Sequence, residues 1–222
     1  MLQLKWPPGK RKRDLLLLTD AVDLLKAVKK VYTYDGLTEY LGLQPSTLSR
    51  YVQGEILPTP RRAREILAKL TEPAFMRRYV LKVFEKYGFS IHKVFTDPDF
   101  LTAVSVYFAR EFLARLAGTR VTYVLTFPGA SSIIAAIVSR SVGLSPVIIG
   151  GNVRSGETLQ ALEKGSMSVM VASILGSEEL TAVEEAMRMR NLRIPLVETV
   201  ILQDPSKVVK LFGKERIIHL FP

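Results

Sequence analysis

A short run of hydrogen-bonding side chains follows Gly42. Gln44, Ser46, Thr47, Ser49 and Arg50 all carry donors or acceptors, and no acidic residue lies among them. Side chains of these types bind base edges in the major groove of DNA, and they also bind phosphate oxygens. We expect this run to contact double-stranded DNA.

Two arginines further along the chain could add phosphate contacts. Thr59 and Pro60 predict the start of a helix, with Thr59 as N-cap and Pro60 at the first helical position. Arg61 and Arg62 would then reach the DNA backbone, where contacts position a protein without specifying a sequence. The basic cluster at residues 10–13 is either a minor-groove arm or a solvated tail.

The elements that would position these side chains are helices. Apolar residues at spacings of three and four predict an amphipathic helix over residues 14–31. Leu37 and Leu41 then form one face of a short helix, which Gly42 can end in a left-handed conformation. Pro45 suits the first turn of the next helix, and Leu48 faces inward.

Residues 14–70 resemble the helix-turn-helix of phage-repressor-like proteins. Gly42 and the apolar positions match that pattern, whereas Thr38 stands where the family usually has alanine. The resemblance implies that the helix beginning at Pro45 enters the major groove. The same module could instead bind a protein partner, or hold duplexes generically within a larger assembly.

Charge is concentrated in the same part of the chain. Residues 1–93 hold 18 Lys or Arg against 9 Asp or Glu, a net +9, whereas residues 94–222 hold 13 against 12, a net +1. A basic segment beside a neutral one is typical of a nucleic-acid-binding module with a separate neighbour. A solvated charged surface is the simpler alternative.

The remainder of the chain alternates between strand and helix patterns. After a basic connector, a possible strand over 89–94 and a helix over 99–117, the pattern predicts strands at 121–126, 146–149, 168–174 and 196–202, with helices at 131–142 and 177–191. Such alternation indicates a parallel sheet with helices on its faces. Ligands bind beyond the carboxyl ends of such strands, here at residues 127–132, 150–156 and 175–178.

The order of these elements over residues 84–205 resembles type I phosphoribosyltransferases. Residues 121–147 resemble the first core strand, diphosphate loop, helix and second strand of that family, and residues 169–180 fall where it carries its phosphoribosyl diphosphate signature. The resemblance implies a ligand site, whose expected residues are Gly129, Ala130, Ser131, Gly176 and Ser177. Arg154, in a Gly-flanked loop, could hold an anion or a base, or the loop could simply be solvated.

The signature departs from the family pattern. Ala172 and Ser173 replace two adjacent acidic residues, and Glu178 and Glu179 replace part of a Thr- and Gly-rich phosphate loop. The positive N-terminal end of a helix stabilises a nearby anion, and the carboxylates of Glu178 and Glu179 would take the place of a bound phosphate there. We expect Ser177 to be the N-cap of this helix. We therefore expect that the chain is not an enzyme. The alternative is an active phosphoribosyltransferase of nucleotide salvage or synthesis.

Composition excludes several other kinds of chemistry. The chain has no cysteine and only two histidines, which are far apart, so we expect neither a metal site nor a cofactor. No export signal and no apolar stretch near 20 residues is visible, so we expect a cytoplasmic protein.

These patterns together predict an α/β protein with an all-α helix-turn-helix domain at residues 1–72 and a doubly wound phosphoribosyltransferase-like domain at residues 73–222. We expect a transcriptional regulator that acts as a homodimer on DNA. Its second domain would dimerise and sense a nucleotide or a phosphoribosyl diphosphate-like ligand.

Overall fold

The computed structural model describes residues 10–150, 157–160 and 162–221. The chain divides into two compact units, Met1–Tyr107 and Phe108–Pro222, which are described separately below. No helix of the described ranges is long and apolar enough to cross a membrane.

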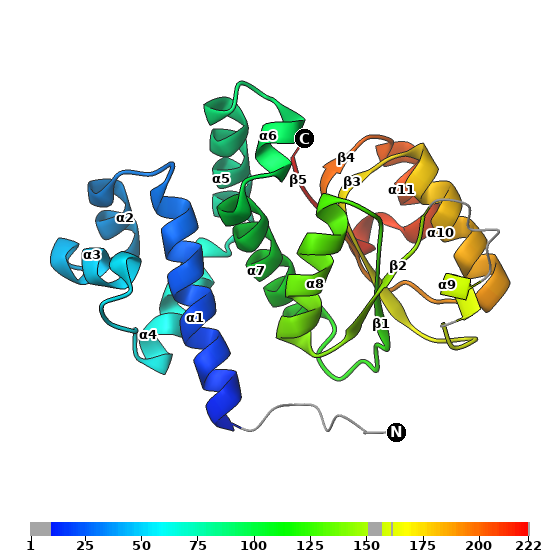
Figure 1. Cartoon of the computed structure of the whole chain (residues 1–222), viewed down its shortest axis with the longest axis horizontal. Helices are drawn as coiled ribbons and strands as arrows, with labels where there is room; N and C mark the ends of the chain where they lie inside the picture. Colours follow the sequence, from blue (N-terminus) through cyan, green and yellow to red (C-terminus); the bar gives the residue numbers. More distant parts are fainter. Residues whose placement is uncertain (1–9, 151–156, 161, 222) are drawn as a thin grey trace. The chain divides into compact units, whose positions relative to one another are not determined.

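The first unit is helical (Figure 1). Its helices are α1 (Lys10–Lys29), α2 (Tyr34–Leu41), α3 (Pro45–Gln53), α4 (Pro60–Leu70), α5 (Pro73–Lys86), α6 (Ile91–Phe95) and the first part of α7 (Pro98–Arg115). Helix α1 packs against α3 and α4 and buries Ala21, Leu24, Leu25 and Val28. The apolar spacing that predicted the first helix therefore marks its core face.

The unit continues past residue 72, where the sequence pattern placed a boundary. The Phe75 ring of α5 stacks between Tyr32 and Tyr40, with ring centroids 5.2 and 5.0 Å apart. The Tyr40 hydroxyl also donates a hydrogen bond to Glu72 Oε2 at 3.0 Å. This packing joins α5 to α2 and to the turn between α1 and α2.

The segment at residues 89–94 is not a strand, contrary to the sequence prediction. Gly88 and Phe89 both take a positive φ of 59° after the end of α5. Ser90 then caps helix α6, because its Oγ accepts a hydrogen bond from the Lys93 N–H at 3.5 Å. The β-favouring residues in this segment are overridden by a helix stop and a helix N-cap that lie side by side.

The second unit contains a five-stranded, wholly parallel sheet in the order β2-β1-β3-β4-β5. The strands are β1 (Tyr123–Thr126), β2 (Ser145–Ile148), β3 (Ser168–Leu175), β4 (Val197–Leu202) and β5 (Ile217–Phe221). The helices of this unit are the last part of α7, α8 (Ala130–Val142), α9 (Glu157–Gln160), α10 (Ser177–Arg190), α11 (Pro205–Phe212) and the short 3-10 helix η1 (Lys214–Arg216). The predicted α/β class and parallel sheet are confirmed, whereas α9, α11 and β5 were not predicted.

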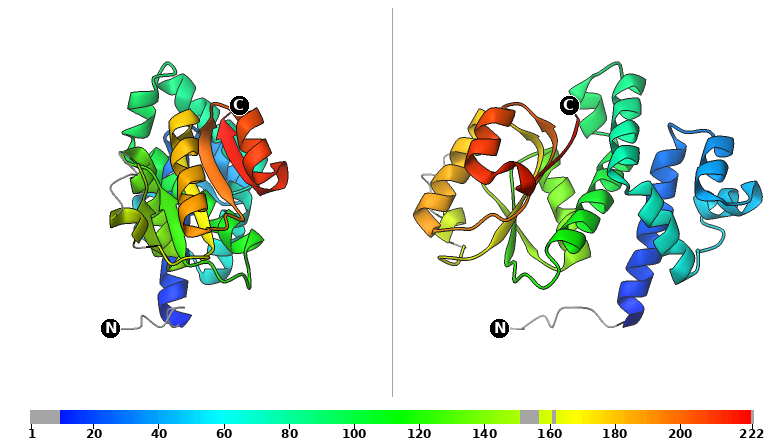
Figure 2. Two further views of the ribbon diagram at one scale, coloured as in Figure 1. Left: turned by 90° about the vertical axis from the view of Figure 1, so that its right-hand side faces the viewer. Right: turned by 180° about the vertical axis from the view of Figure 1, so that it is seen from behind.

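Helices cover both faces of this sheet. The β1–β2 connection runs outward in one direction and the β3–β4 and β4–β5 connections run in the other, so right-handed crossovers place their helices on opposite faces. Figure 2 shows α8 on one face and α10 and α11 on the other. The strand order reverses between β1 and β3, and such a reversal is where sheets of this kind bind ligands.

Candidate functional site

The predicted DNA-contacting residues begin in the turn between α2 and α3 and continue along α3. Gly42 ends α2 with φ 66°, and its N–H donates to the Thr38 carbonyl at 2.8 Å. Leu43 buries its side chain, and α3 begins two residues later at Pro45. The two helices are therefore joined by a tight turn of three residues, Gly42 to Gln44.

Helix α3 presents a polar end to solvent. Leu48 and Tyr51 are buried against the unit, whereas Gln44, Ser46 and Arg50 are exposed. Thr47 and Ser49 are half-buried. Gln44 makes no side-chain capping bond, so the first N–H groups of α3 keep their donor capacity and the positive end of the helix dipole lies at this surface.

The predicted backbone-contacting arginines lie at the start of α4. Thr59 is the N-cap, and its Oγ1 accepts from the Arg62 N–H at 3.3 Å, as the sequence indicated. Arg61 Nε and Arg62 Nη1 lie 3.1 and 2.8 Å from the two oxygens of Glu65. Part of their charge is therefore already paired.

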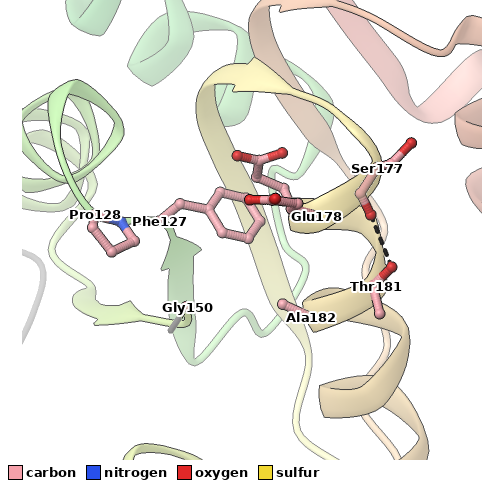
Figure 3. Close-up of a pocket in the computed structure, with 8 residues that line it drawn as sticks. Phe127, Pro128, Gly150, Ser177, Glu178, Thr181 and Ala182 are labelled. Carbon is pink, nitrogen blue, oxygen red and sulfur yellow. Dashed lines mark hydrogen bonds between the residues drawn. The ribbon is translucent and has the colours of Figure 1, made fainter. Parts of the chain in front are cut away.

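The second unit has a cleft of about 680 Å³ at the carboxyl edge of its sheet. Figure 3 shows Phe127 and Pro128 on one side and the first turns of α10 on the other. The lining residues are Phe127, Pro128, Gly150, Ser177, Glu178, Glu179, Thr181 and Ala182. Among the described residues, the side chains that line the cleft carry two carboxylates and no cation, so these residues combine an apolar wall with an acidic one.

Two glycines allow close approaches around this cleft. A Cβ on Gly150 would lie 2.8 Å from Pro128 Cδ, and one on Gly176 would lie 2.3 Å from Gln203 Oε1. Both distances are shorter than real contacts. The Pro128 ring is rigid, so a larger residue at Gly150 would push the loops after β1 and β2 apart, whereas the flexible Gln203 side chain could turn away from a larger residue at Gly176.

One N–H group at the N-terminus of α10 is bonded by a side chain of the helix itself. Glu179 Oε2 accepts a hydrogen bond from the Gly176 N–H at 3.0 Å. Gly176 is the N-cap and Ser177 the first helical residue, so the prediction of Ser177 as N-cap is wrong by one position. The Glu178 carboxylate remains exposed beside the cleft.

The predicted ligand residues do not all lie on the cleft. Ser177 lines it, whereas Gly129 and Ala130 start α8 and Ser131 is buried. Ser131 Oγ accepts from the Ser173 N–H at 2.9 Å and lies 2.8 Å from Ser173 Oγ. Arg154 lies outside the described residues.

Sequence reasoning missed Glu179, Thr181 and Ala182 as cleft residues. Helical periodicity could have found Thr181 and Ala182, since they lie three or four residues after Ser177 and Glu178 and share their side of the helix. The Thr181 hydroxyl donates to the Ser177 carbonyl at 2.8 Å. Among the residues placed in the structure, no group of acidic or histidine side chains could hold a metal ion.

Comparison with known proteins gives structural similarity but no family. No family model and no curated protein matches the sequence. Similar solved structures include adenine phosphoribosyltransferase from Saccharomyces cerevisiae, at 13% identity and TM-score 0.46 over 57% of this chain and 82% of that one. Adenine phosphoribosyltransferase from Leishmania tarentolae matches at 11% identity and TM-score 0.48 over 60% and 74%. UMP synthase from Leishmania donovani matches at 15% identity and TM-score 0.48 over 72% of this chain and 39% of that one.

These similar structures are all enzymes, two of them adenine phosphoribosyltransferases and one a UMP synthase. That finding overturns the prediction that the chain is not an enzyme. The sequence analysis excluded enzyme activity because residues of a signature known from another family are replaced here. The replacement of those residues does not show that a site is inactive. At these identities and TM-scores the similarity assigns no substrate or reaction to this chain.

Proposed function

We propose that the first unit binds duplex DNA with sequence preference, and that α2 and α3 form a helix-turn-helix. The observation that carries the proposal is the three-residue turn that leads from the left-handed Gly42 into α3, with the inner face of α3 buried and its polar N-terminal end exposed. Such an end, offered by the second helix of a pair, can enter a major groove.

The polar residues of α3 divide into two roles in this proposal. Gln44 and Arg50 have side chains long enough for two-pronged contacts, with adenine and guanine respectively. Ser46, Thr47 and Ser49 would contact bases or phosphates, and Arg61 and Arg62 would exchange their pairing with Glu65 for phosphate oxygens. The partner in this proposal is double-stranded DNA.

The second unit supplies a ligand site and a dimer contact in the same proposal. Its cleft lies beside a reversal of strand order, where parallel sheets bind nucleotides, and Phe127 offers an aromatic wall for a base. We propose a phosphoribosyltransferase-like domain that dimerises and senses a nucleotide-related metabolite. A bound metabolite would shift the distance between two recognition helices.

Selection of genomic duplex fragments by the full-length protein at physiological salt tests this function. The variants Gln44→Ala and Arg50→Ala are expected to lose about 10- to 100-fold in affinity for selected fragments, because each two-pronged base contact contributes about 1–3 kcal/mol. Arg188→Ala, an exposed arginine of α10, is the matched control, which should bind like the wild type.

Selected fragments that share a motif would support the proposal. Uniform binding of all fragments, unchanged in Gln44→Ala, would show that the unit only holds phosphates, and sequence preference would have to be abandoned. Absence of any binding would reject DNA as the partner.

A second candidate function is phosphoribosyl transfer in the cleft. The position of the cleft at the carboxyl ends of β1 and β2, beside the N-terminus of α10, favours it. Glu178 is the lining carboxylate that is not bonded to the Gly176 N–H, so it is the group available to contact a ribose hydroxyl.

This candidate is tested with the full chain, phosphoribosyl diphosphate, magnesium and a panel of bases. Release of diphosphate that falls at least 10-fold in Glu178→Gln, but not in the control Glu184→Gln further along α10, would establish it. No release above the rate without protein would reject it.

A further inference from the structure

Helix α5 carries a line of exposed cations. Arg78, Lys82 and Lys86 recur at intervals of four residues and are exposed, so they lie along one side of the helix. Arg77 adds a fourth exposed cation, and Glu85 is the one acidic residue of α5. We call Arg78, Lys82 and Lys86 the α5 stripe.

The residues of the α5 stripe differ from several arginines of the same unit, because those arginines form ion pairs with carboxylates. Arg50 Nε lies 3.5 Å from Glu55, and Arg61 and Arg62 both contact Glu65. Within the described part of the chain, none of the three stripe residues forms an ion pair with a carboxylate. Their full positive charges therefore face solvent.

Aromatic rings hold two of these cations in place. Lys82 Nζ lies 5.3 Å from the centre of the Tyr32 ring, and Lys86 Nζ lies 5.1 Å from that of Tyr87. At the end of α1, Lys29 Nζ lies 4.4 Å from the Tyr34 ring. A ring stabilises an ammonium group without neutralising it, so these lysines keep their positive charge.

The nearby carboxylates have other partners. Glu72 accepts from the Tyr40 hydroxyl, Asp97 accepts from the Tyr87 hydroxyl at 2.7 Å, and Asp99 pairs with Lys30. Only Glu85 lies on the helix itself. A polyanion that approached α5 would therefore meet few competing carboxylates.

The α5 stripe belongs to the same packed body as α3. Phe75, in the first turn of α5, stacks on Tyr40 near the end of α2, and the turn at Gly42 leads from there into α3. Lys82 of the stripe lies over the Tyr32 ring, which stacks on Phe75, so the stripe runs beside this aromatic stack.

We propose that Arg78, Lys82 and Lys86 form a second phosphate-binding surface, which contacts the backbone of the same DNA duplex that α3 reads. This inference rests on the proposed DNA binding. The stripe adds affinity without sequence preference, because phosphates carry no base identity. It also makes binding steeply dependent on salt.

Salt titration of binding to a selected duplex tests the inference. The triple variant Arg78→Gln/Lys82→Gln/Lys86→Gln is compared with Arg188→Gln/Lys210→Gln/Lys214→Gln, which removes the same charge from exposed sites in the second unit. Each phosphate contact contributes about 0.9 to the slope of log K against log salt, so the α5 variant should lose about 3 units of slope and about 100-fold in affinity at physiological salt. The control should keep both, and thermal melting by circular dichroism verifies the fold of each variant.

The outcomes separate this inference from the function on which it rests. If Arg50→Ala weakens binding but the α5 variant keeps the slope and affinity of the wild type, DNA binding stands and the stripe has no part in it. If the wild type binds no duplex, the proposed function fails first. A third outcome is that the wild type binds phosphatidylserine vesicles, that the α5 variant does not bind them, and that both proteins bind the duplex equally well. The stripe then binds a membrane surface, and the inference is wrong.

Discussion

At the scale of single residues, Glu198 is the most unusual group in the second unit. It is fully buried in β4, and neither carboxyl oxygen has a hydrogen-bond partner among the described residues. Burial raises the pKa of Glu198 well above its ordinary value of 4.5, and the Glu111 charge raises it further, whereas Arg115 opposes both. Burial therefore favours the neutral acid form of this carboxyl in the folded chain.

This pKa predicts how Glu198→Gln changes stability. The unfolded carboxyl ionises above about pH 4.5 while the folded one stays protonated, so the stability of the wild type falls as pH rises from there to the folded pKa. The slope is about 1.4 kcal/mol per pH unit for one proton. Glu198→Gln removes this loss and should be more stable than the wild type at pH 8, with little difference at pH 4.

Urea unfolding across this pH range measures the effect. Glu184→Gln, an exposed carboxylate on α10, is the control and should follow the wild type. Parallel pH profiles for Glu198→Gln and the wild type would show that the buried carboxyl does not change its protonation on unfolding.

Ser131 gives a second prediction at this scale. Its hydroxyl accepts from the Ser173 N–H, and both residues are buried. Ser131→Ala leaves that N–H without a partner and should cost about 1–3 kcal/mol of unfolding free energy. Ser141→Ala on the same helix, whose hydroxyl bonds only its own α8 backbone, should cost less than half as much. Equal losses in urea unfolding would contradict the role given to the Ser131–Ser173 contact.

At the scale of elements, the sequence predicted most helices and strands because their signals are local. Thr59 before Pro60 marked the start of α4, and alternation of strand and helix marked the parallel sheet. Helix α11 and strand β5 were missed, although Asp204 before Pro205 is a cap of the same kind, with its Oδ1 accepting from the Lys207 N–H at 3.1 Å. The cleft depends on approaches such as Gly150 to Pro128, which join residues far apart in sequence and leave no local signal.

The turn after α2 provides the test at this scale. Gly42 holds φ 66°, and an L-residue in this left-handed conformation costs about 1–2 kcal/mol. Gly42→Ala should therefore lower the unfolding free energy by about that amount. It should also weaken DNA binding if the turn relaxes and α3 moves.

Gly36→Ala is the matched control within α2. Gly36 has a right-handed helical backbone, and an added Cβ would meet Thr33 Oγ1 at 3.3 Å as its closest contact. Alanine has the higher helix propensity, so this variant should lose no more than about 0.5 kcal/mol. A loss in Gly36→Ala as large as that in Gly42→Ala would mean that the turn conformation is not the cause.

At the scale of the whole molecule, most of the excess positive charge lies in the helical part of the chain. The net charge of residues 1–93 is +9 and that of residues 94–222 is +1, and the first stretch is helical whereas the sheet lies in the second. In the proposed dimer, the basic part of each chain binds the polyanion and the nearly neutral part contacts its copy. Two nearly neutral surfaces can approach each other without strong charge repulsion.

Such a dimer makes a geometric prediction about its DNA. Two recognition helices related by a two-fold axis contact half-sites about 34 Å apart, or about 10 base pairs centre to centre. Inserting five base pairs between the half-sites turns one of them to the opposite face of the duplex. The second protomer then loses its contact, and affinity should fall about 100-fold. Changing the central bases at constant spacing serves as the control and should preserve binding. Equal affinity for both spacings, measured with a protein that sediments as a monomer, would mean that each chain binds alone and that the sheet unit does not set the distance between recognition helices.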